Sequence, residues 1–288
     1  MGALPFLPSL LRPSAALIKA TALDLAILAG HAVLYPTGVI QERPSQNSPC
    51  EPQVITPIEP LDASEASILA TVEAPHEDRL PVLLLHGFID NRSVFVLLRR
   101  SLRQHGWSEV EALNYSPLCC DIRAAAALLG PHIEEVCART GHDQVDIVGH
   151  SLGGLIARYY VQRLGGDARV RTLVALGTPH SGTRAVPLLS AHPIVRQMRP
   201  DSDLIEELAQ PAPNCTTHFV NFWSDLDQLM VPLETACLDH PDLISHNVQV
   251  SGIGHLALPV HAAVAAGIRQ ALDAASPGGE ASEAASVA

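Results

Sequence analysis

Gln144-Val-Asp-Ile-Val-Gly-His-Ser-Leu-Gly-Gly154 is the stretch of this 288-residue sequence that best predicts its fold. Residues 144–148 form a short apolar run that is typical of a buried strand, and the spacing of apolar residues over 152–164 predicts a helix. Ser151 therefore stands in a strand-to-helix turn, flanked by glycines that let neighbouring backbone approach closely. A Gly-x-Ser-x-Gly pentapeptide also arises by chance, so its meaning depends on the rest of the chain.

The same alternation of strand and helix continues along the chain. Apolar runs predict further strands at residues 81–85, 110–115, 170–176, 217–223 and 247–250. Helical spacing predicts a helix that carries Val94, Leu97, Leu98 and Leu102 on one face and stops at Gly106, and further helices at 122–139 and 260–272. Strands and helices in this order form a mostly parallel sheet through right-handed crossovers. We therefore expect the α/β class, with helices on both faces of the sheet.

The remaining segments predict how the chain is divided. Residues 1–60 comprise an apolar N-terminal helix followed by a proline-rich strap, because prolines recur from Pro36 to Pro60 and disfavour regular helix. Residues 61–275 form one α/β domain, in which the prolines of residues 182–213 predict a short cap insertion over the carboxyl edge of the sheet. Residues 276–288 are small and polar, which predicts a disordered tail.

The apolar N-terminal segment does not read as a targeting or spanning element. It lacks a basic beginning, and Lys19 and Asp24 interrupt the residues that would have to sit in a bilayer. Residues 14–35 predict a helix that either docks on the body or lies on a membrane surface, and docking is favoured because the helix has no Lys/Arg-rich face. We therefore expect a cytoplasmic or peripherally membrane-associated protein, with secretion left open.

The net charge indicates which partners to expect, and the cysteines indicate whether disulfides form. The sequence has 18 Lys+Arg against 30 Asp+Glu, a formal net charge of -12, so a nucleic-acid partner is not expected. The six cysteines form no Cys-x-x-Cys pair. Cys215 and Cys237 flank a predicted strand and a loop; they either form a disulfide or remain buried thiols, and the thiols are favoured.

A serine nucleophile needs a base that titrates near neutral pH and a carboxylate that orients it. The turn of Ser151 belongs to a fold in which nucleophile, acid and base follow in that order, so the base should lie beyond the last strands. His255 stands there in the glycine-flanked loop Ser251-Gly-Ile-Gly-His-Leu. His261 and His246 are less favoured, because one falls in a predicted helix and the other precedes a strand.

The acid should follow the preceding strand, where Ser224-Asp-Leu-Asp227 offers two carboxylates. We favour Asp227 and expect Asp225 to cap the loop or to bind backbone amides. An oxyanion needs two backbone N–H donors. Leu152, the first residue after the nucleophile, would supply one, and Phe88 in the loop after strand 81–85 would supply the other. His86 beside it is better explained by a structural role.

Four blocks carry a resemblance to a known family: Leu85-His-Gly-Phe88, Gly149-His-Ser-Leu-Gly-Gly154, Leu176-Gly-Thr-Pro-His-Ser-Gly-Thr183 and Gly252-Ile-Gly-His255. Over residues 80–270 the chain resembles bacterial lipases and esterases of the α/β-hydrolase superfamily, the triacylglycerol lipase group. The resemblance implies a triad of Ser151, Asp227 and His255, oxyanion amides at Phe88 and Leu152, and a structural His180.

Two departures from the family's pattern limit what is transferred. Larger relatives have aspartates of a calcium loop beside the histidine, whereas Leu256, Ala257 and Leu258 follow it here, so we expect no obligatory metal and no cofactor. The cap at residues 182–213 is also short for an interfacial lid. Esterase action is therefore better supported than true lipase action.

The sequence thus predicts a serine carboxylic ester hydrolase that acts on hydrophobic acyl esters through an acyl-enzyme. Apolar residues of the cap either line an acyl site or pack in the core: Val186, Leu188, Leu189, Ile194, Val195 and Met198. A thioesterase, an acyltransferase or a polyester hydrolase would use the same triad, and contact with a lipid interface stays open. A binding protein on a degenerate scaffold is disfavoured, because nucleophile, acid and base are all present.

Overall fold

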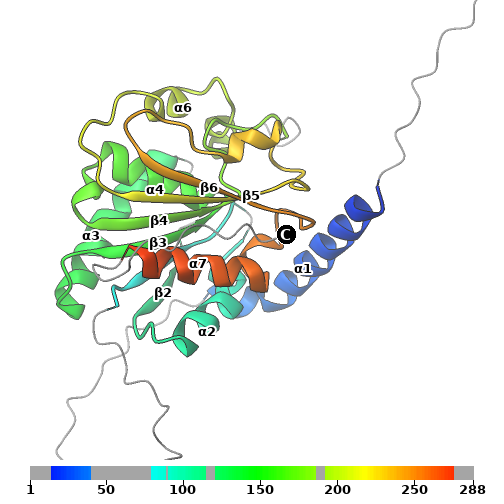
Figure 1. The fold of residues 1–288 in the computed structure, drawn as a ribbon, viewed down its shortest axis with the longest axis horizontal. Coiled ribbons are helices and arrows are strands. Elements are labelled where there is room, and N and C mark those ends of the chain that lie inside the picture. The colour runs from blue at the N-terminus through cyan, green and yellow to red at the C-terminus, as the bar shows by residue number, and fades with distance from the viewer. Residues whose placement is uncertain (1–13, 40–78, 89, 115–120, 186–191, 276–288) are drawn as a thin grey trace, which may run out of the picture.

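A computed structural model shows a six-stranded sheet in which every pairing is parallel, in the order β2-β1-β3-β4-β5-β6 (Figure 1). The structure describes residues 14–39, 79–88, 90–114, 121–185 and 192–275. The strands are β1 Val82–Leu85, β2 Val110–Leu113, β3 Val145–His150, β4 Val170–Leu176, β5 His218–Ser224 and β6 Ile244–Val250. This sheet, flanked by helices, confirms the α/β class.

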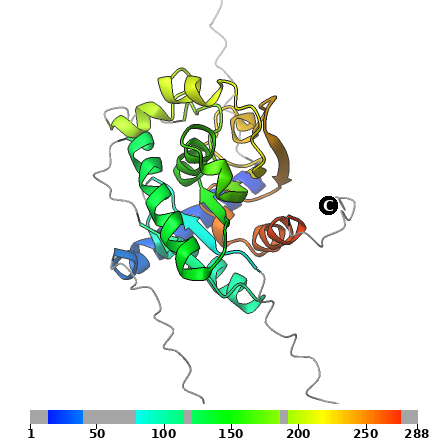
Figure 2. The same ribbon diagram turned by 90° about the vertical axis from the view of Figure 1, so that its left-hand side faces the viewer.

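The helices cover both faces of the sheet (Figure 2). They are α1 Ala15–Val39, α2 Val96–Gln104, α3 Ile122–Thr140, α4 Leu152–Arg163, α5 Pro193–Gln197, α6 Asp203–Leu208 and α7 Ala262–Ala274. Short 3-10 turns occur at η1 Arg92–Phe95, η2 Gly166–Ala168, η3 Leu233–Ala236 and η4 Leu258–Val260. One apolar core lies between the sheet and α3 and α4, and a second lies between the sheet and α2 and α7.

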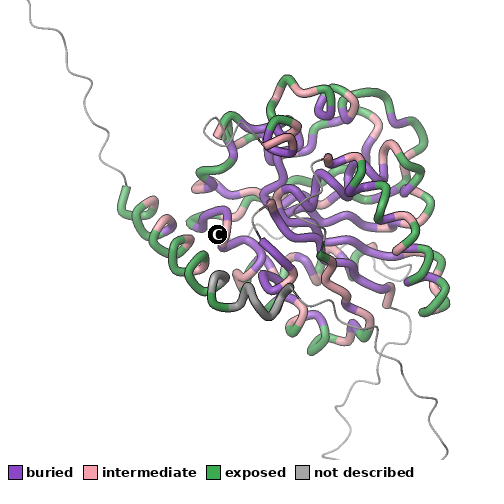
Figure 3. Tube along the Cα trace, turned by 180° about the vertical axis from the view of Figure 1, so that it is seen from behind, coloured by how far each residue is buried: buried purple, intermediate pink, exposed green. Residues whose placement is uncertain are grey.

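Strand β1 shows why apolar residues dominate the central strands. Leu83 and Leu85 belong to the core under α3 and α4, whereas Val82 and Leu84 belong to the core under α2 and α7. Successive side chains of a strand point to opposite faces, so a strand covered on both sides needs apolar residues at every position. All four residues are fully buried, as the burial colouring of the central strands shows (Figure 3).

Several boundaries differ from those predicted. β6 begins at Ile244, three residues early, because its exposed edge position tolerates the polar residues that concealed it in the sequence. The first helix after β1 opens with the 3-10 turn η1, and Leu97 is 58% exposed while Val94, Leu98 and Leu102 are buried. Those three residues are four apart and form one narrow stripe, which leaves Leu97 beside it.

The N-terminal helix and the cap insertion lie outside the sheet. α1 runs to Val39, past Pro36 where we expected the strap to begin, so this proline lies in the last turn of the helix and does not end it. The cap contains α5 and α6, and Arg123 at the start of α3 pairs with Glu207 of α6. The strap from residue 40 onward and the tail from residue 276 lie outside the described residues.

Candidate active site

Ser151 occupies the single residue between β3 and α4. Its backbone has φ 53° and ψ −116°, and among the described residues Asn214 is the only other non-glycine residue with a positive φ. This conformation is strained for a residue with a Cβ, and it persists only where surrounding structure enforces it. The Ser151 side chain makes no capping hydrogen bond to α4, so a role as a simple helix cap does not account for the serine. The residue is partly exposed, as a nucleophile must be.

Glycines enforce the sharp turn around Ser151. A Cβ on Gly153 would lie 2.2 Å from the Leu85 carbonyl oxygen, and one on Gly149 would lie 2.6 Å from the backbone of Gly154. A Cβ on Gly154 would in turn overlap the Thr178 side chain, whose hydroxyl donates to the Ser151 carbonyl oxygen at 3.1 Å. The start of α4 therefore packs directly on the ends of β1 and β4, which only residues without side chains allow.

His255 and Asp227 form a buried pair beside this turn. The loop after β5 carries Asp227 and the loop after β6 carries His255, and the Nδ1–H of His255 donates to Asp227 Oδ2 at 2.7 Å. Asp227 and His255 are only 2% and 3% exposed. The other carboxylate oxygen of Asp227 accepts a hydrogen bond from the Leu229 amide at 2.9 Å, which fixes the orientation of the carboxylate.

The electrostatic environment favours the protonated imidazole of His255. Burial by itself lowers the pKa of His255, but the charge and hydrogen bond of Asp227 outweigh it, and Asp90 and Asp24 add to the effect. The result is a pKa above the ordinary histidine value of 6.5. Such a histidine can accept a proton during a reaction and hold it while a leaving group departs.

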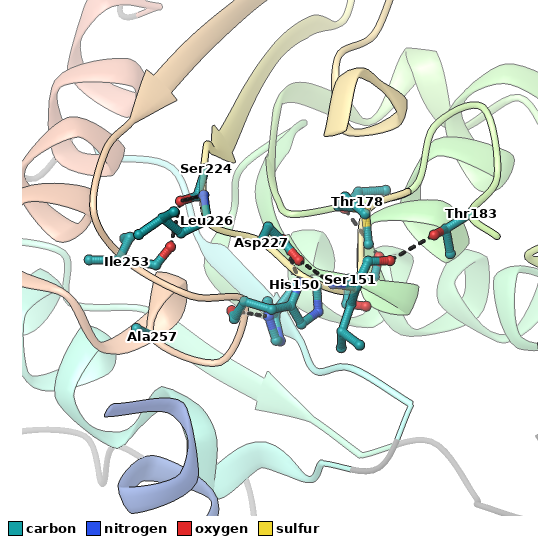
Figure 4. Close-up of polar contacts among 12 residues, drawn as sticks. His150, Ser151, Thr178, Thr183, Ser224, Leu226, Asp227, Ile253 and Ala257 are labelled. Atoms are coloured by element: carbon teal, nitrogen blue, oxygen red, sulfur yellow. Dashed lines mark hydrogen bonds and ion pairs between the residues drawn. The ribbon is translucent and has the colours of Figure 1, made fainter. Parts of the chain in front are cut away.

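The end of β4 brings the serine and the His255–Asp227 pair to one place. The Ser151 amide donates to the Leu176 carbonyl oxygen at 2.8 Å. The next residue, Gly177, packs against the pair so closely that a Cβ there would lie 3.0 Å from Asp227 Oδ2 and 3.0 Å from His255 Nδ1. Figure 4 shows Ser151 and Asp227 at this meeting point.

Asp225, the alternative acid, lies elsewhere. Its carboxylate accepts a hydrogen bond from the Gly252 amide at 2.9 Å, at the start of the loop that carries His255. Ser224 stabilises the same loop, because its hydroxyl donates to the Ile253 carbonyl oxygen. Asp225 therefore binds a backbone amide, the structural role that we expected for the aspartate not chosen as the acid.

The loop after β1 supplies the other wall of the site. A Cβ on Gly87 would lie 3.5 Å from the Ser151 Cβ and 3.3 Å from His150 Nδ1, so this loop passes directly over the serine. Phe88 follows Gly87, and its ring packs edge-on against His192 at a centroid distance of 4.9 Å. Leu152 is the first residue of α4, where backbone N–H groups lack partners within the helix. Leu152 thus follows Ser151 directly, and Phe88 follows the glycine that packs against it.

The structure also reveals a residue to which the sequence analysis gave no role. His150 is fully buried beside Ser151, its ring centroid 4.8 Å from that of His255. Its Nε2–H donates to the His255 carbonyl oxygen at 3.2 Å, and its Nδ1 lies 3.6 Å from a carboxylate oxygen of Asp90. Burial lowers the pKa of His150, and the hydrogen bond from its Nε2 supports the His255 loop. Its place inside the Gly-x-Ser-x-Gly pentapeptide was the signal available in the sequence.

The other histidines that we considered lie apart from this pair. His86 donates from Nδ1 to the Gly87 carbonyl oxygen at 2.8 Å, and the carbonyl oxygen of His180 accepts from the buried Arg158 at 2.8 Å. His246 is exposed on β6 instead of preceding it, and His261 caps α7 instead of lying within it. Both expectations about position were therefore wrong, because each boundary is shifted by one to three residues.

The cap residues and cysteines can be placed in part. Ile194, Val195 and Met198 are buried in the core under α3 and α4, which favours packing over substrate contact for these three. Val186, Leu188 and Leu189 lie outside the described residues. Cys215 and Cys237 are both free thiols. Within the described ranges there is no cluster of three or more potential metal ligands, and no helix long and apolar enough to cross a membrane.

Comparison with known proteins identifies the family of this chain. The model of a family described as palmitoyl protein thioesterase matches residues 81–238, more than half of the chain. A triacylglycerol lipase from Burkholderia plantarii is 30% identical over 131 residues, 43% of this chain and 35% of that lipase. One from Pseudarthrobacter phenanthrenivorans is 30% identical over 113 residues, 36% of this chain and 34% of that lipase. Each match thus spans about a third of the lipase's length.

Solved structures share the architecture at lower sequence identity. The mature form of the Bacillus licheniformis lipase BlEst2 superimposes with a TM-score of 0.59 at 15% identity, covering 70% of this chain and 95% of that chain. Aspergillus fumigatus lipase B gives a TM-score of 0.57 at 17% identity, covering 83% of this chain and 64% of that chain. At such identities the likeness establishes a common fold.

Proposed function

Because the chain is an α/β-hydrolase that belongs to the palmitoyl protein thioesterase family, we propose that it is a serine acyl hydrolase with Ser151, His255 and Asp227 as its triad. One observation carries the proposal. The buried Asp227–His255 hydrogen bond of 2.7 Å lies at the end of β4, where the strained Ser151 also binds the backbone. Strained nucleophile turns and buried His–carboxylate pairs are both typical of acyl-transfer sites.

The proposed reaction has two halves. His255 takes the proton from Ser151 Oγ as this oxygen attacks the acyl carbon, and the Phe88 and Leu152 amides stabilise the resulting oxyanion. His255 then gives that proton to the leaving oxygen or sulfur, which departs and leaves an acyl-serine. Water, deprotonated by His255, then attacks the acyl-serine. The bond between the acyl carbon and Ser151 Oγ breaks, this oxygen takes the proton from His255, and the acid is released. Asp227 keeps the proton on Nδ1, so that Nε2 is free to act as the base.

Two substrate classes have separate support. The partial match to triacylglycerol lipases supports hydrophobic oxygen esters as the substrates of this chain. The match to the palmitoyl protein thioesterase family supports acyl thioesters as substrates. Both classes use the same triad, and they differ in the leaving group, an alcohol in one and a thiol in the other. We place hydrophobic oxygen esters first, and thioesters are the second candidate.

A paired substrate series tests the proposal. For acyl chains from acetyl to palmitoyl, kcat/KM is measured with a p-nitrophenyl ester and with the coenzyme A thioester of the same acid, and tributyrin and triolein emulsions are assayed alongside. Hydrolysis of the longer oxygen esters by the wild type, absent in Ser151→Ala, is the expected result. Higher kcat/KM for the thioesters at every chain length would overturn the order of candidates. No turnover of either series would overturn the proposal.

A further inference from the structure

Helix α1 docks on the loops of the candidate active site, although it precedes the sheet by more than forty residues (Figure 1). Ala20 is buried in the contact, at 1% exposed. The Thr21 hydroxyl oxygen accepts a hydrogen bond from Gln228, the residue after Asp227, at 2.6 Å. Asp24 accepts one from the Ala257 amide at 3.2 Å. Residues 20, 21 and 24 share one helix face, so this face meets both the acid loop and the histidine loop.

Asp24 fits into a space that the sequence leaves open for it. A Cβ on Gly254 would lie 2.0 Å from Asp24 Oδ2, and the three atoms nearest to that Cβ all belong to the Asp24 carboxylate. The carboxylate therefore lies directly against the residue that precedes His255, while it binds the amide two residues after His255. One side chain from α1 thus spans the loop on both sides of the histidine.

We propose that Asp24 is a positioning residue, whose carboxylate holds the loop from Gly254 to Ala257 and so couples the docking of α1 to the placement of His255. This inference rests on the proposed function, since the placement matters for turnover only if His255 is the base. The loop has no regular secondary structure before η4, so side-chain contacts must supply its rigidity. Ser224 and Asp225 hold its beginning, and Asp24 holds the part that carries the histidine.

The charge of Asp24 also acts on His255. The titratable groups that face the imidazole are Asp227, Asp90, Asp24 and His150. The pKa of Asp24 is raised above its ordinary value, because burial and the charge of Asp227 outweigh the positive charge of His255 and the Leu256 and Ala257 amides. The ionised carboxylate stabilises the protonated imidazole, so its removal should lower the pKa of His255.

Substitutions at Asp24 separate the hydrogen bond from the charge. Asp24→Ala removes both, and we expect kcat to fall about 10-fold with KM little changed, because misplacement of a catalytic group slows chemistry more than binding. Asp24→Asn keeps an acceptor oxygen, and we expect it to recover most of kcat. In both variants the acid limb of the pH–kcat/KM profile should move about 0.3 to 0.5 unit lower, as expected for the loss of one nearby charge.

Two control variants have exposed side chains. Lys19→Ala changes a charge on α1 itself, and Glu206→Gln makes the same change of charge as Asp24→Asn on α6. Both should retain wild-type kcat and the wild-type acid limb. Wild-type kcat in Asp24→Ala, or an unmoved acid limb in both Asp24 variants, would overturn the inference.

Gly254 provides an independent arm of the experiment. Gly254→Ala should displace the Asp24 carboxylate and reduce kcat by a similar factor. In the double variant Asp24→Ala, Gly254→Ala, the added methyl group occupies the vacated space, so kcat should be no lower than in Asp24→Ala alone. If the reductions in kcat of the two single variants instead multiplied in the double variant, the two residues would act separately, and this would overturn the inference.

A readout without turnover separates this inference from the proposed function. In the Ser151→Ala background, hydrogen exchange of the Ala257 amide and NMR titration of His255 are measured with and without the further substitution Asp24→Ala, which removes both the acceptor and the charge. We expect faster exchange and a lower His255 pKa on substitution. If the wild type hydrolyses neither substrate series but these shifts appear, the proposed function fails and the contact stands. Unchanged exchange and pKa would overturn the contact.

Discussion

The serine side and the histidine side of the site are built in different ways. Ser151 is held by its immediate neighbours: a buried strand before it, a helix after it, and glycines at 149, 153 and 154 that let the helix start against β1 and β4. His255 is held by side chains that are distant in sequence, among them Asp227, Asp24 and Ser224. The proposed nucleophile is thus positioned by backbone geometry, and the proposed base by tertiary contacts.

This difference affects how rigid each side of the site is and how well each side tolerates substitutions. A turn enforced by backbone packing cannot adjust without moving two strands and a helix, so changes there affect the whole fold. A loop held by side-chain hydrogen bonds can shift locally, so changes there affect chemistry before stability. We expect substitutions on the serine side to destabilise the fold or to abolish turnover. On the histidine side, we expect kcat to fall by different amounts, according to which contact is lost.

The largest effect should come from the nucleophile itself. Ser151→Ala removes the attacking oxygen, and we expect kcat to fall about 10⁴-fold or more on any substrate that the wild type cleaves. The Asp227–His255 hydrogen bond does not involve the serine side chain, so the low-field NMR signal of the bridging proton should persist. Turnover within 10-fold of wild type would remove Ser151 from the mechanism.

Substitution of Asp227 should give the next largest effect, and Asp225 serves as its comparison. Asp227→Asn cannot hold the required tautomer of His255, and we expect kcat to fall about 10³- to 10⁴-fold. Asp225→Asn retains an oxygen that can accept from the Gly252 amide, so kcat should change no more than about 3-fold. The two kcat values, measured on one p-nitrophenyl ester, decide between the carboxylates. The reverse order would assign the acid role to Asp225.

Matched glycine variants test the contrast in rigidity. Gly153→Ala places a methyl group against the Leu85 carbonyl, and we expect the free energy of unfolding to drop by about 3 kcal/mol or more. Gly252→Ala, in the histidine loop, meets nothing within 4 Å but has φ +81°, so the cost should be about 1 kcal/mol. Urea unfolding measures both. Equal losses would contradict the contrast between backbone packing and loop contacts.

The pH dependence of the wild type gives the smallest signal. His255 must be neutral to act as the base, and Asp227 raises its pKa above 6.5 against the effect of burial. As pH falls, kcat/KM should therefore begin to decline above the ordinary histidine pKa, not below it. Initial rates between pH 5 and 9 at constant ionic strength measure the midpoint. A midpoint below 6.5 would mean that desolvation outweighs the carboxylate.

Local sequence was sufficient to predict the serine side. The strand, the turn and the helix around Ser151 follow one another directly, and periodicity and glycine placement indicate all three. The parallel sheet was predictable for the same reason, because the central strands β1, β3 and β4 are largely buried on both faces and rich in apolar residues. The exposed edge strand β6 lacks this signal, and its start was predicted three residues too late.

Residues close together in the chain were enough to predict the α/β class, the strand-to-helix turn at Ser151 and the loop that carries His255. Contacts between distant parts of the fold were needed to show which aspartate meets that histidine, that His150 supports it, and that Asp24 of α1 reaches its loop. Asp225 and Asp227 differ by two positions but point to different partners. Such contacts join residues up to 233 positions apart, and no periodicity or spacing encodes them before the chain folds.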